Sequence, residues 1–266
     1  AAGGRQVIKT RISRMGARVV CALAIGIVAG GALPASAQSR TGSRDCGDVP
    51  SVPGLFSETI RDLRGMSSAS SLGIMAIGGA AALAARPVDG DVARNFLGQT
   101  STNSAFAPGA VLGGTPFQLG VAATTYAFGR ALHKPCAASL GADLIQAQLM
   151  AEGLTMGLKE VTRRSRPEGT GFSFPSGHTT SAFASATVLQ RHFGWKVGIP
   201  AYAAAAYVAA SRVEMNRHYL SDVAFGAALG IVAGRTVTVG HGHRPLVTPF
   251  ASPETAGAQF TWIGRK

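Results

Sequence analysis

The chain has 266 residues, of which 46% are hydrophobic and only 14% are charged, and its formal net charge is +12. This balance excludes an intrinsically disordered chain, and three cysteines are too few for a disulfide-dense mini-protein. What remains is one globular domain, or a domain with membrane affinity. The basic excess suggests an anionic partner, which is a nucleic acid, a membrane surface or a phosphate.

Residues 1–37 have the pattern of a secretory signal peptide. The first 18 residues hold five basic and no acidic side chains, an apolar run extends from Val19 to Leu33, and Ala35-Ser36-Ala37 forms a small-x-small cleavage site. The alternative is an uncleaved anchor, but the run is shorter than the ~20 residues of a spanning helix. We therefore expect an exported bacterial protein at the periplasmic or extracytoplasmic face of the membrane.

Two cysteines remain after this cleavage site, Cys46 and Cys136. In an oxidising compartment they either pair or persist as separate thiols, and the sequence leaves both possibilities open.

After the leader, helix-type patterns dominate. We expect an irregular lead-in over 38–53, a loop-rich stretch over 86–116, and a turn between Gly194 and Pro200. The apolar periodicity is clearest in one stripe that steps by four and three residues: Leu140, Leu144, Ala147, Ala151, Leu154, Leu158 and Val161. Helices are predicted over this stripe and over Leu55–Arg64, 65–85, Phe117–Ala131, Ser176–Phe193, 201–213 and Tyr219–Val237, with the uncharged segment 65–85 buried.

The fold class expected from this order is all-α. It is a helical bundle over 54–243 with a short irregular or hairpin-like tail over 244–266, in which Leu246–Phe250 and Gln259–Ile263 resemble strands. Membrane insertion stays open. The segment 65–85 is long enough to span a bilayer, whereas the uncharged run 223–234 covers only ~18 Å at ~1.5 Å per residue. This favours a soluble or peripheral domain over an integral bundle.

Three short motifs can carry chemistry. The first runs from Lys159 through Arg166 to Pro167, and alone it is an ordinary basic helix end. The second is Pro175-Ser176-Gly177-His178, where Ser176 is a good N-cap and the first helical turn offers N–H groups to an anion. The third is Ser211-Arg212, then His218, then Asp222 one helical turn later, so that the carboxylate can orient the imidazole.

The three motifs in this order resemble the type 2 phosphatidic acid phosphatase (PAP2) superfamily. That superfamily includes bacterial acid phosphatases, lipid phosphate phosphatases and vanadium haloperoxidases. The resemblance covers residues 159–222 and matches every defining position of the three motifs.

The resemblance implies a phosphohistidine mechanism. His218 would attack phosphorus, Asp222 would orient His218, and His178 would protonate the leaving oxygen and then activate water. The phosphoryl oxygens would be bound by Lys159, Arg166, Ser176, Gly177 and Arg212. We expect neither a metal nor another cofactor, although vanadate would fit the phosphate site. His241-Gly242-His243 is the one near candidate for a metal site, and we interpret it as a polar loop. The adjacent Arg163 and Arg164 either broaden the positive field at the mouth of the site or face solvent, and the second interpretation is favoured.

The expected function is an exported phosphatase acting on phosphate monoesters or diphosphates, in which the substrate is a lipid phosphate or a small soluble ester. Alternatives are a vanadate-dependent haloperoxidase, which the short chain disfavours, and a non-catalytic anion-binding protein of the envelope. We expect a phosphate-containing substrate, possible membrane association and no nucleic-acid partner. The oligomeric state is left open.

Overall fold

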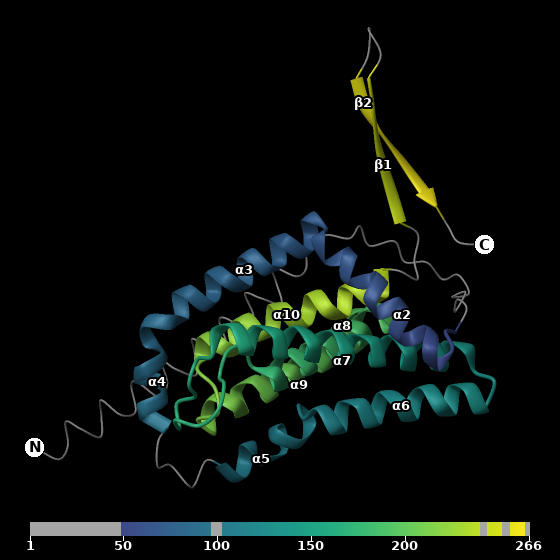
Figure 1. Cartoon of the computed structure of the whole chain (residues 1–266). Coiled ribbons are helices and arrows are strands. Elements are labelled where there is room, and N and C mark those ends of the chain that lie inside the picture. The colour runs from purple at the N-terminus through teal and green to yellow at the C-terminus, as the bar shows by residue number, and fades with distance from the viewer. Residues whose placement is uncertain (1–48, 97–102, 240–243, 252–255, 264–266) are drawn as a thin grey trace, which may run out of the picture.

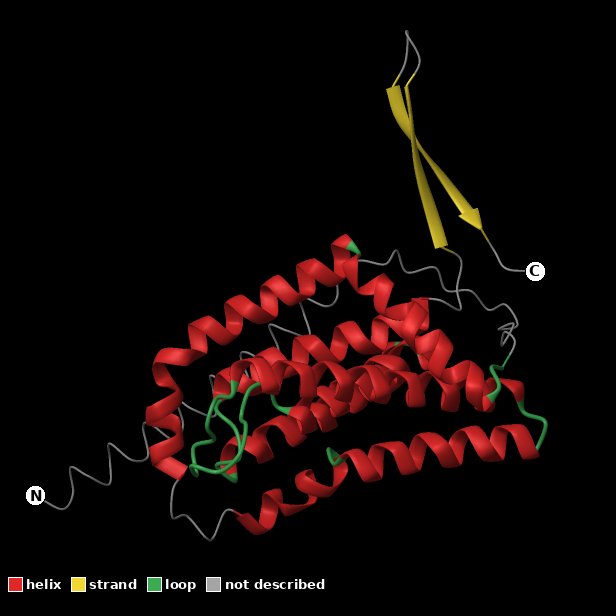
Figure 2. Ribbon diagram, viewed as in Figure 1, coloured by secondary structure: helices red, strands yellow, loops and turns green. Residues whose placement is uncertain are grey.

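The structure, a computed structural model, describes residues 49–96, 103–239, 244–251 and 256–263 (Figure 1). The expected leader and Cys46 lie outside these residues, as does His241-Gly242-His243. Within the described part, helices form a bundle and two strands follow it (Figure 2). The all-α class with a hairpin-like tail is therefore confirmed.

The helices of the first half are α2 (Val52–Leu63), α3 (Ala69–Ala85), α4 (Asp89–Phe96), α5 (Asn103–Leu112) and α6 (Thr115–Ala131), with short 3-10 turns η1 (Arg64–Ser67) and η2 (Arg86–Val88). The expectation of loops over 86–116 is wrong, since α4 and α5 occupy most of that stretch. Its Pro and Gly residues suggested breaks, but Pro87 lies in η2 and Pro108 is accommodated inside α5.

The second half contains α7 (Pro135–Thr162), α8 (Gly177–Phe193), α9 (Trp195–Glu214) and α10 (Leu220–Val239). Helix α9 already begins after Gly194, whose φ of 78° suits glycine, so the predicted turn up to Pro200 is wrong. The tail consists of β1 (Arg244–Ala251) and β2 (Ala256–Ile263), which pair antiparallel with Leu246 opposite Thr261.

Helix α10 lies at the centre of the bundle and packs against α8, α3 and α7. Its contact with α8 depends on glycine. A Cβ on Gly230 would stand 2.3 Å from the Thr180 carbonyl oxygen, and Gly226 and Gly234, one helical turn to either side, also leave no room for a side chain. Because these positions lack a side chain, the two helices approach backbone to backbone, and Phe183 and Val232 fill the core around them.

The predicted apolar stripe of α7 is buried in its middle but not at its end. Leu144, Ala147 and Ala151 are buried, whereas Val161 is 82% exposed because α7 extends past the helices that cover it. The segment 65–85 is also not a fully buried helix, since α3 packs on α10 with one face and leaves Leu72 and Leu83 exposed.

Two described helical stretches are long and apolar enough to cross a membrane, Ala69–Asn95 and Leu220–Thr238. They differ in their surroundings, because 28% of the first window and 89% of the second are buried inside the bundle. The second is thus the central core helix of the fold, and only the first presents most of its apolar surface outward.

Candidate active site

All three sequence motifs meet at one end of the bundle. Lys159 lies in the last turn of α7, Arg166 follows in the loop that leads to α8, and His178 lies in the first turn of α8. Arg212 lies in the last turn of α9, and His218 precedes α10, whose first turn holds Asp222. The loop between α7 and α8 crosses this end, and an isolated antiparallel bridge between Ser165 and Phe172 closes it.

The imidazole of His218 is buried and fixed by the loop. Its Nδ1 lies 2.7 Å from the Ser173 carbonyl oxygen, so Nδ1 carries the proton and donates it there. The Asp222 carboxylate Oδ2 is 3.7 Å from the same nitrogen, an ion-pair distance but too long for a hydrogen bond. The expected proximity of His218 and Asp222 is present, but the hydrogen-bond acceptor is the Ser173 carbonyl. Nε2 is thereby left with its lone pair.

Burial lowers the pKa of His218, although the Asp222 carboxylate opposes this effect. The positive charges of Lys159 and Arg166 lower the pKa further. A neutral imidazole is the form that has a free nitrogen lone pair, so these neighbours favour a form of His218 that is able to act as a nucleophile.

Three cations surround the two histidines. The Lys159 ammonium donates to the Phe172 carbonyl at 2.7 Å, and the Arg166 Nε donates to the same oxygen at 3.4 Å. The Arg212 guanidinium is buried, and its Nε has no hydrogen-bond partner among the described residues. A buried donor without an acceptor is costly, which makes it a natural ligand for an anion such as a phosphoryl oxygen.

Burial and the close spacing of positive charges lower the pKa values of side chains in this cluster of cations and histidines. Burial, with the neighbouring Arg166, lowers the pKa of Lys159 to about 8. Burial also lowers the pKa of His178 to about 4, and the positive charge of Arg212 adds to the effect. The group thus holds excess positive charge, which a phosphate dianion would neutralise.

The start of α8 departs from the expected cap. Ser176 occupies the N-cap position, but its hydroxyl accepts a hydrogen bond from the Thr179 hydroxyl at 3.0 Å and caps no backbone N–H. Its own backbone N–H donates to the Asp222 carbonyl oxygen at 3.1 Å, which ties α8 to α10. Gly177 is the first residue of α8, where the helix dipole and the N–H groups of the first turn favour an anion.

Arg164 does not face solvent, although its place in the basic motif suggested that it would. Its neighbour Arg163 is exposed as expected, with 71% of the side chain accessible, but only 20% of the Arg164 side chain is accessible. The Arg164 guanidinium forms ion pairs of 2.7 Å with both Asp89 and Asp222. These ion pairs offset the free-energy cost of burying the guanidinium charge. The sequence motif shows only a run of basic residues and does not reveal these partners.

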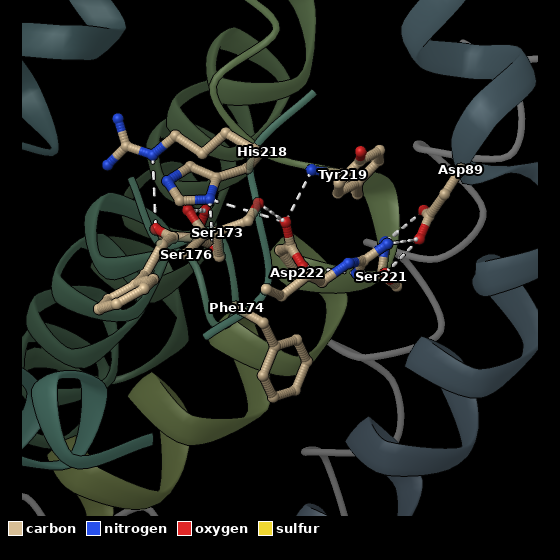
Figure 3. Close-up of polar contacts among 12 residues, drawn as sticks. Asp89, Ser173, Phe174, Ser176, His218, Tyr219, Ser221 and Asp222 are labelled. Carbon is tan, nitrogen blue, oxygen red and sulfur yellow. Dashed lines mark hydrogen bonds and ion pairs between the residues drawn. The ribbon is translucent and has the colours of Figure 1, made fainter. Parts of the chain in front are cut away.

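Sequence reasoning missed three residues of this site, namely Ser173, Arg164 and Asp89. Figure 3 shows the side chains that connect His218 through Asp222 to Asp89. The Ser173 hydroxyl donates to the Asp222 Oδ2, and the backbone N–H of Tyr219 donates to that oxygen at 2.8 Å. Only Arg164 had a sequence signal, its place inside the basic motif.

Cys136 is disulfide-bonded, and both other cysteines lie outside the described residues, so the pairing with Cys46 stays a prediction. The described residues contain no group of three or more His, Cys, Asp or Glu side chains that could hold a metal ion.

The fold and site together define a helical bundle with two histidines and three cations at one end, and comparison with known proteins shows which family this part of the chain is similar to. Residues 155–245, which contain all three motifs, match the PAP2 superfamily, as the motifs predicted.

Two curated relatives are similar in part. A lipid A 1-phosphatase of Porphyromonas gingivalis is 44% identical over 75 residues, which is 27% of this chain and 17% of that protein. A decaprenylphosphoryl-5-phosphoribose phosphatase of Mycobacterium tuberculosis is 33% identical over 106 residues, which is 36% of this chain and 58% of that protein. The chain thus spans less than two thirds of either relative.

Among solved structures, a transmembrane PAP2-type phosphatidylglycerolphosphate phosphatase from Bacillus subtilis shares the fold. The match has a TM-score of 0.51 and 21% sequence identity, and it covers 70% of this chain and 92% of that one.

Proposed function

We propose that the chain is an exported, membrane-associated phosphatase that hydrolyses a lipid phosphate through a phosphohistidine on His218. The observation that carries this proposal is the hydrogen bond from His218 Nδ1 to the Ser173 carbonyl, which leaves Nε2 unprotonated beside three cations. Similarity to two lipid phosphate phosphatases and to a membrane enzyme of the same fold supports the substrate class.

In the first step, His218 Nε2 forms a bond to phosphorus while the bond between phosphorus and the ester oxygen breaks. His178 gives its proton to that oxygen, and the alcohol leaves. The pKa of His178 is lowered to about 4 by burial and by Arg212. A bound phosphate dianion offsets these cations and raises that pKa, so that His178 takes up its proton together with the substrate.

In the second step, neutral His178 takes a proton from water, and the water oxygen attacks phosphorus. The bond to His218 Nε2 breaks, and inorganic phosphate is released. Lys159, Arg166 and Arg212 stabilise the negative charge on the equatorial oxygens in both transition states, which is the role that metal ions have in many phosphoryl-transfer enzymes.

An apolar groove supports a hydrophobic alcohol. It has a volume of about 290 Å³ and runs between α6 and α9 over a floor formed by α7 and α8. Val208 and Leu112 line the end of it nearest the active site, where Gly113 packs between Val208 and His178, since a Cβ there would lie 2.4 Å from Val208 and 3.1 Å from His178. His178 protonates the leaving oxygen, so the chain attached to that oxygen would enter this groove.

The test is a substrate panel of lipid phosphates, lipid diphosphates and small soluble esters, assayed for phosphate release. We expect His218→Ala to lose nearly all activity and Arg163→Ala, a nearby exposed control, to keep it. Equal phosphate release by the wild type and His218→Ala would refute the assigned nucleophile. Activity on soluble esters alone would refute the lipid substrate.

A further inference from the structure

Asp89 lies on α4, outside the segment that matches the family, and yet it reaches the catalytic end of the bundle. Its side chain is almost fully buried, with 3% of the residue exposed. A buried carboxylate needs partners, and Asp89 has three contacts. Its Oδ2 forms an ion pair of 2.7 Å with Arg164, its Oδ1 accepts the Ser221 backbone N–H at 3.0 Å, and its Oδ2 accepts the Ser221 hydroxyl at 2.5 Å.

Arg164 connects this carboxylate to the one beside the nucleophile. One terminal nitrogen, Nη2, pairs with Asp89, while Nη1 pairs with Asp222 Oδ1 at 2.7 Å and donates to the Ser221 hydroxyl at the same distance. The guanidinium also stacks on Tyr219, with Cζ 4.0 Å from the ring centre. The arginine is therefore held on three sides, and its fork fixes the orientation of the Asp222 carboxylate.

We propose that Asp89 and Arg164 are positioning residues for phosphoryl transfer, which fix Asp222 and set how much of its negative charge acts on His218. This proposal rests on the phosphatase function proposed above. Asp222 Oδ1 is held by Arg164, and Oδ2 is held by Ser173 and the Tyr219 N–H. With both oxygens fixed, the carboxylate stabilises the positive charge that develops on His218 during phosphorylation.

The charges predict opposite effects of the two residues on His218. The groups that face His218 are Lys159 of α7, Arg166 of the loop, His178 of α8 and Asp222 of α10. Arg164 offsets Asp222, so replacing Arg164 with methionine strengthens the negative field and raises the pKa of His218. Replacing Asp89 with asparagine frees the Arg164 charge to act on Asp222, and the pKa of His218 falls.

The experiment measures kcat, KM and the pH profile of kcat/KM for Asp89→Asn and Arg164→Met on one phosphate ester. We expect kcat to fall by about 10- to 100-fold, as for other residues that orient a functional group through a second one, with KM changed less than about 3-fold. The acid limb of the profile should shift to higher pH in Arg164→Met and to lower pH in Asp89→Asn. A double variant should lose little more than the worse single variant, because both act through Asp222.

Matched controls lie beside each residue. Asp91 is on the same helix as Asp89 and pairs with Arg94 at the surface, and Arg163 is the exposed neighbour of Arg164. Asp91→Asn and Arg163→Met should keep wild-type kinetics. Arg164→Lys is a milder variant, since one ammonium keeps the charge but cannot pair with two carboxylates as the fork does. It should fold, lose kcat and show a smaller pH shift.

The outcomes separate the two proposals. A wild type that releases no phosphate would refute the phosphatase function itself. An active wild type with unchanged kcat in Asp89→Asn or Arg164→Lys would refute the positioning role alone. Limbs that shift in the same direction, or additive losses in the double variant, would also refute it, because a general loss of packing does not give opposite pH shifts.

Discussion

Filling the apolar groove should change which substrates are processed without damaging the chemistry. Ala204 of α9 lines the groove, and its neighbour Ala203 is also exposed but is not among the residues that line it. Ala204→Phe places six additional carbon atoms in the groove, whereas Ala203→Phe adds the same ring to the outer surface. The pair therefore differs in the position of the ring and in little else.

The magnitude follows from the groove volume. About 290 Å³ holds on the order of ten groups of the size of a water molecule, at ~30 Å³ each. Full burial of a methylene contributes ~0.8 kcal/mol, and we take about a third of this value because the groove is open on one side. Displacing six methylenes then costs about 1.5 kcal/mol, which is a roughly 10-fold loss in kcat/KM for a long-chain phosphate.

The assay compares kcat/KM for alkyl phosphates that differ only in chain length, under conditions in which each ester is monomeric. The wild type should improve with chain length up to about ten carbons and then level off. Ala204→Phe should flatten this series while its activity on the shortest ester stays within about 2-fold. A flat series in the wild type, or the same loss in Ala203→Phe, would contradict a chain-binding role of the groove.

Three further predictions follow from the site and the core. The pKa of Lys159 is lowered to about 8, so this cation is lost as the pH rises through 8. In the free enzyme kcat/KM should therefore fall above pH 8, and Lys159→Arg should abolish this alkaline limb. The same alkaline limb in Lys159→Arg as in the wild type would contradict the assignment to Lys159. Vanadate should inhibit competitively with the phosphate ester and protect the enzyme against thermal unfolding, with both effects weakened at least 10-fold in Arg212→Ala. Gly230→Ala should lower the unfolding free energy by about 1–3 kcal/mol, because the added methyl group overpacks against α8. Gly79 has open space around it, so Gly79→Ala should raise the unfolding free energy by about 0.5–1 kcal/mol. Thermal melts of both variants would test this.

Much of the bundle could be predicted from the sequence because its helices carry clear local signals. The periodic stripe marks α7 and the end residues mark α8, and the structure has helices in both places, although Val161 at the end of the stripe is exposed and the Ser176 side chain caps no backbone N–H. The error over 86–116 has a physical reason. Pro108 and the glycines of that stretch oppose helix formation locally, and the contact of α5 with α9 outweighs them.

The candidate site, like the bundle, could be predicted from the sequence only where the signal is local. The three motifs mark residues whose spacing along the chain is short, and the structure brings all of them to one end of the bundle. Asp89 is far from every motif in sequence, and nothing in a lone acidic residue at a helix start indicates a partner. Only the packing of α4 against the bundle places it beside Arg164, so its part in the site needed the fold.

The glycine contact between α8 and α10 has a mechanical consequence for catalysis. Helix α8 carries His178, the proposed general acid, in its first turn, and α10 begins two residues after His218, the proposed nucleophile. The separation of these two histidines therefore depends on how the two helices pack against each other. The glycines are four residues apart, so they allow the two helices to pack in one axial register. The next equivalent register would require a shift of ~6 Å along the helix axis, at ~1.5 Å per residue. We therefore expect the two histidines to keep a constant spacing from one substrate to the next, whatever the size of the alcohol.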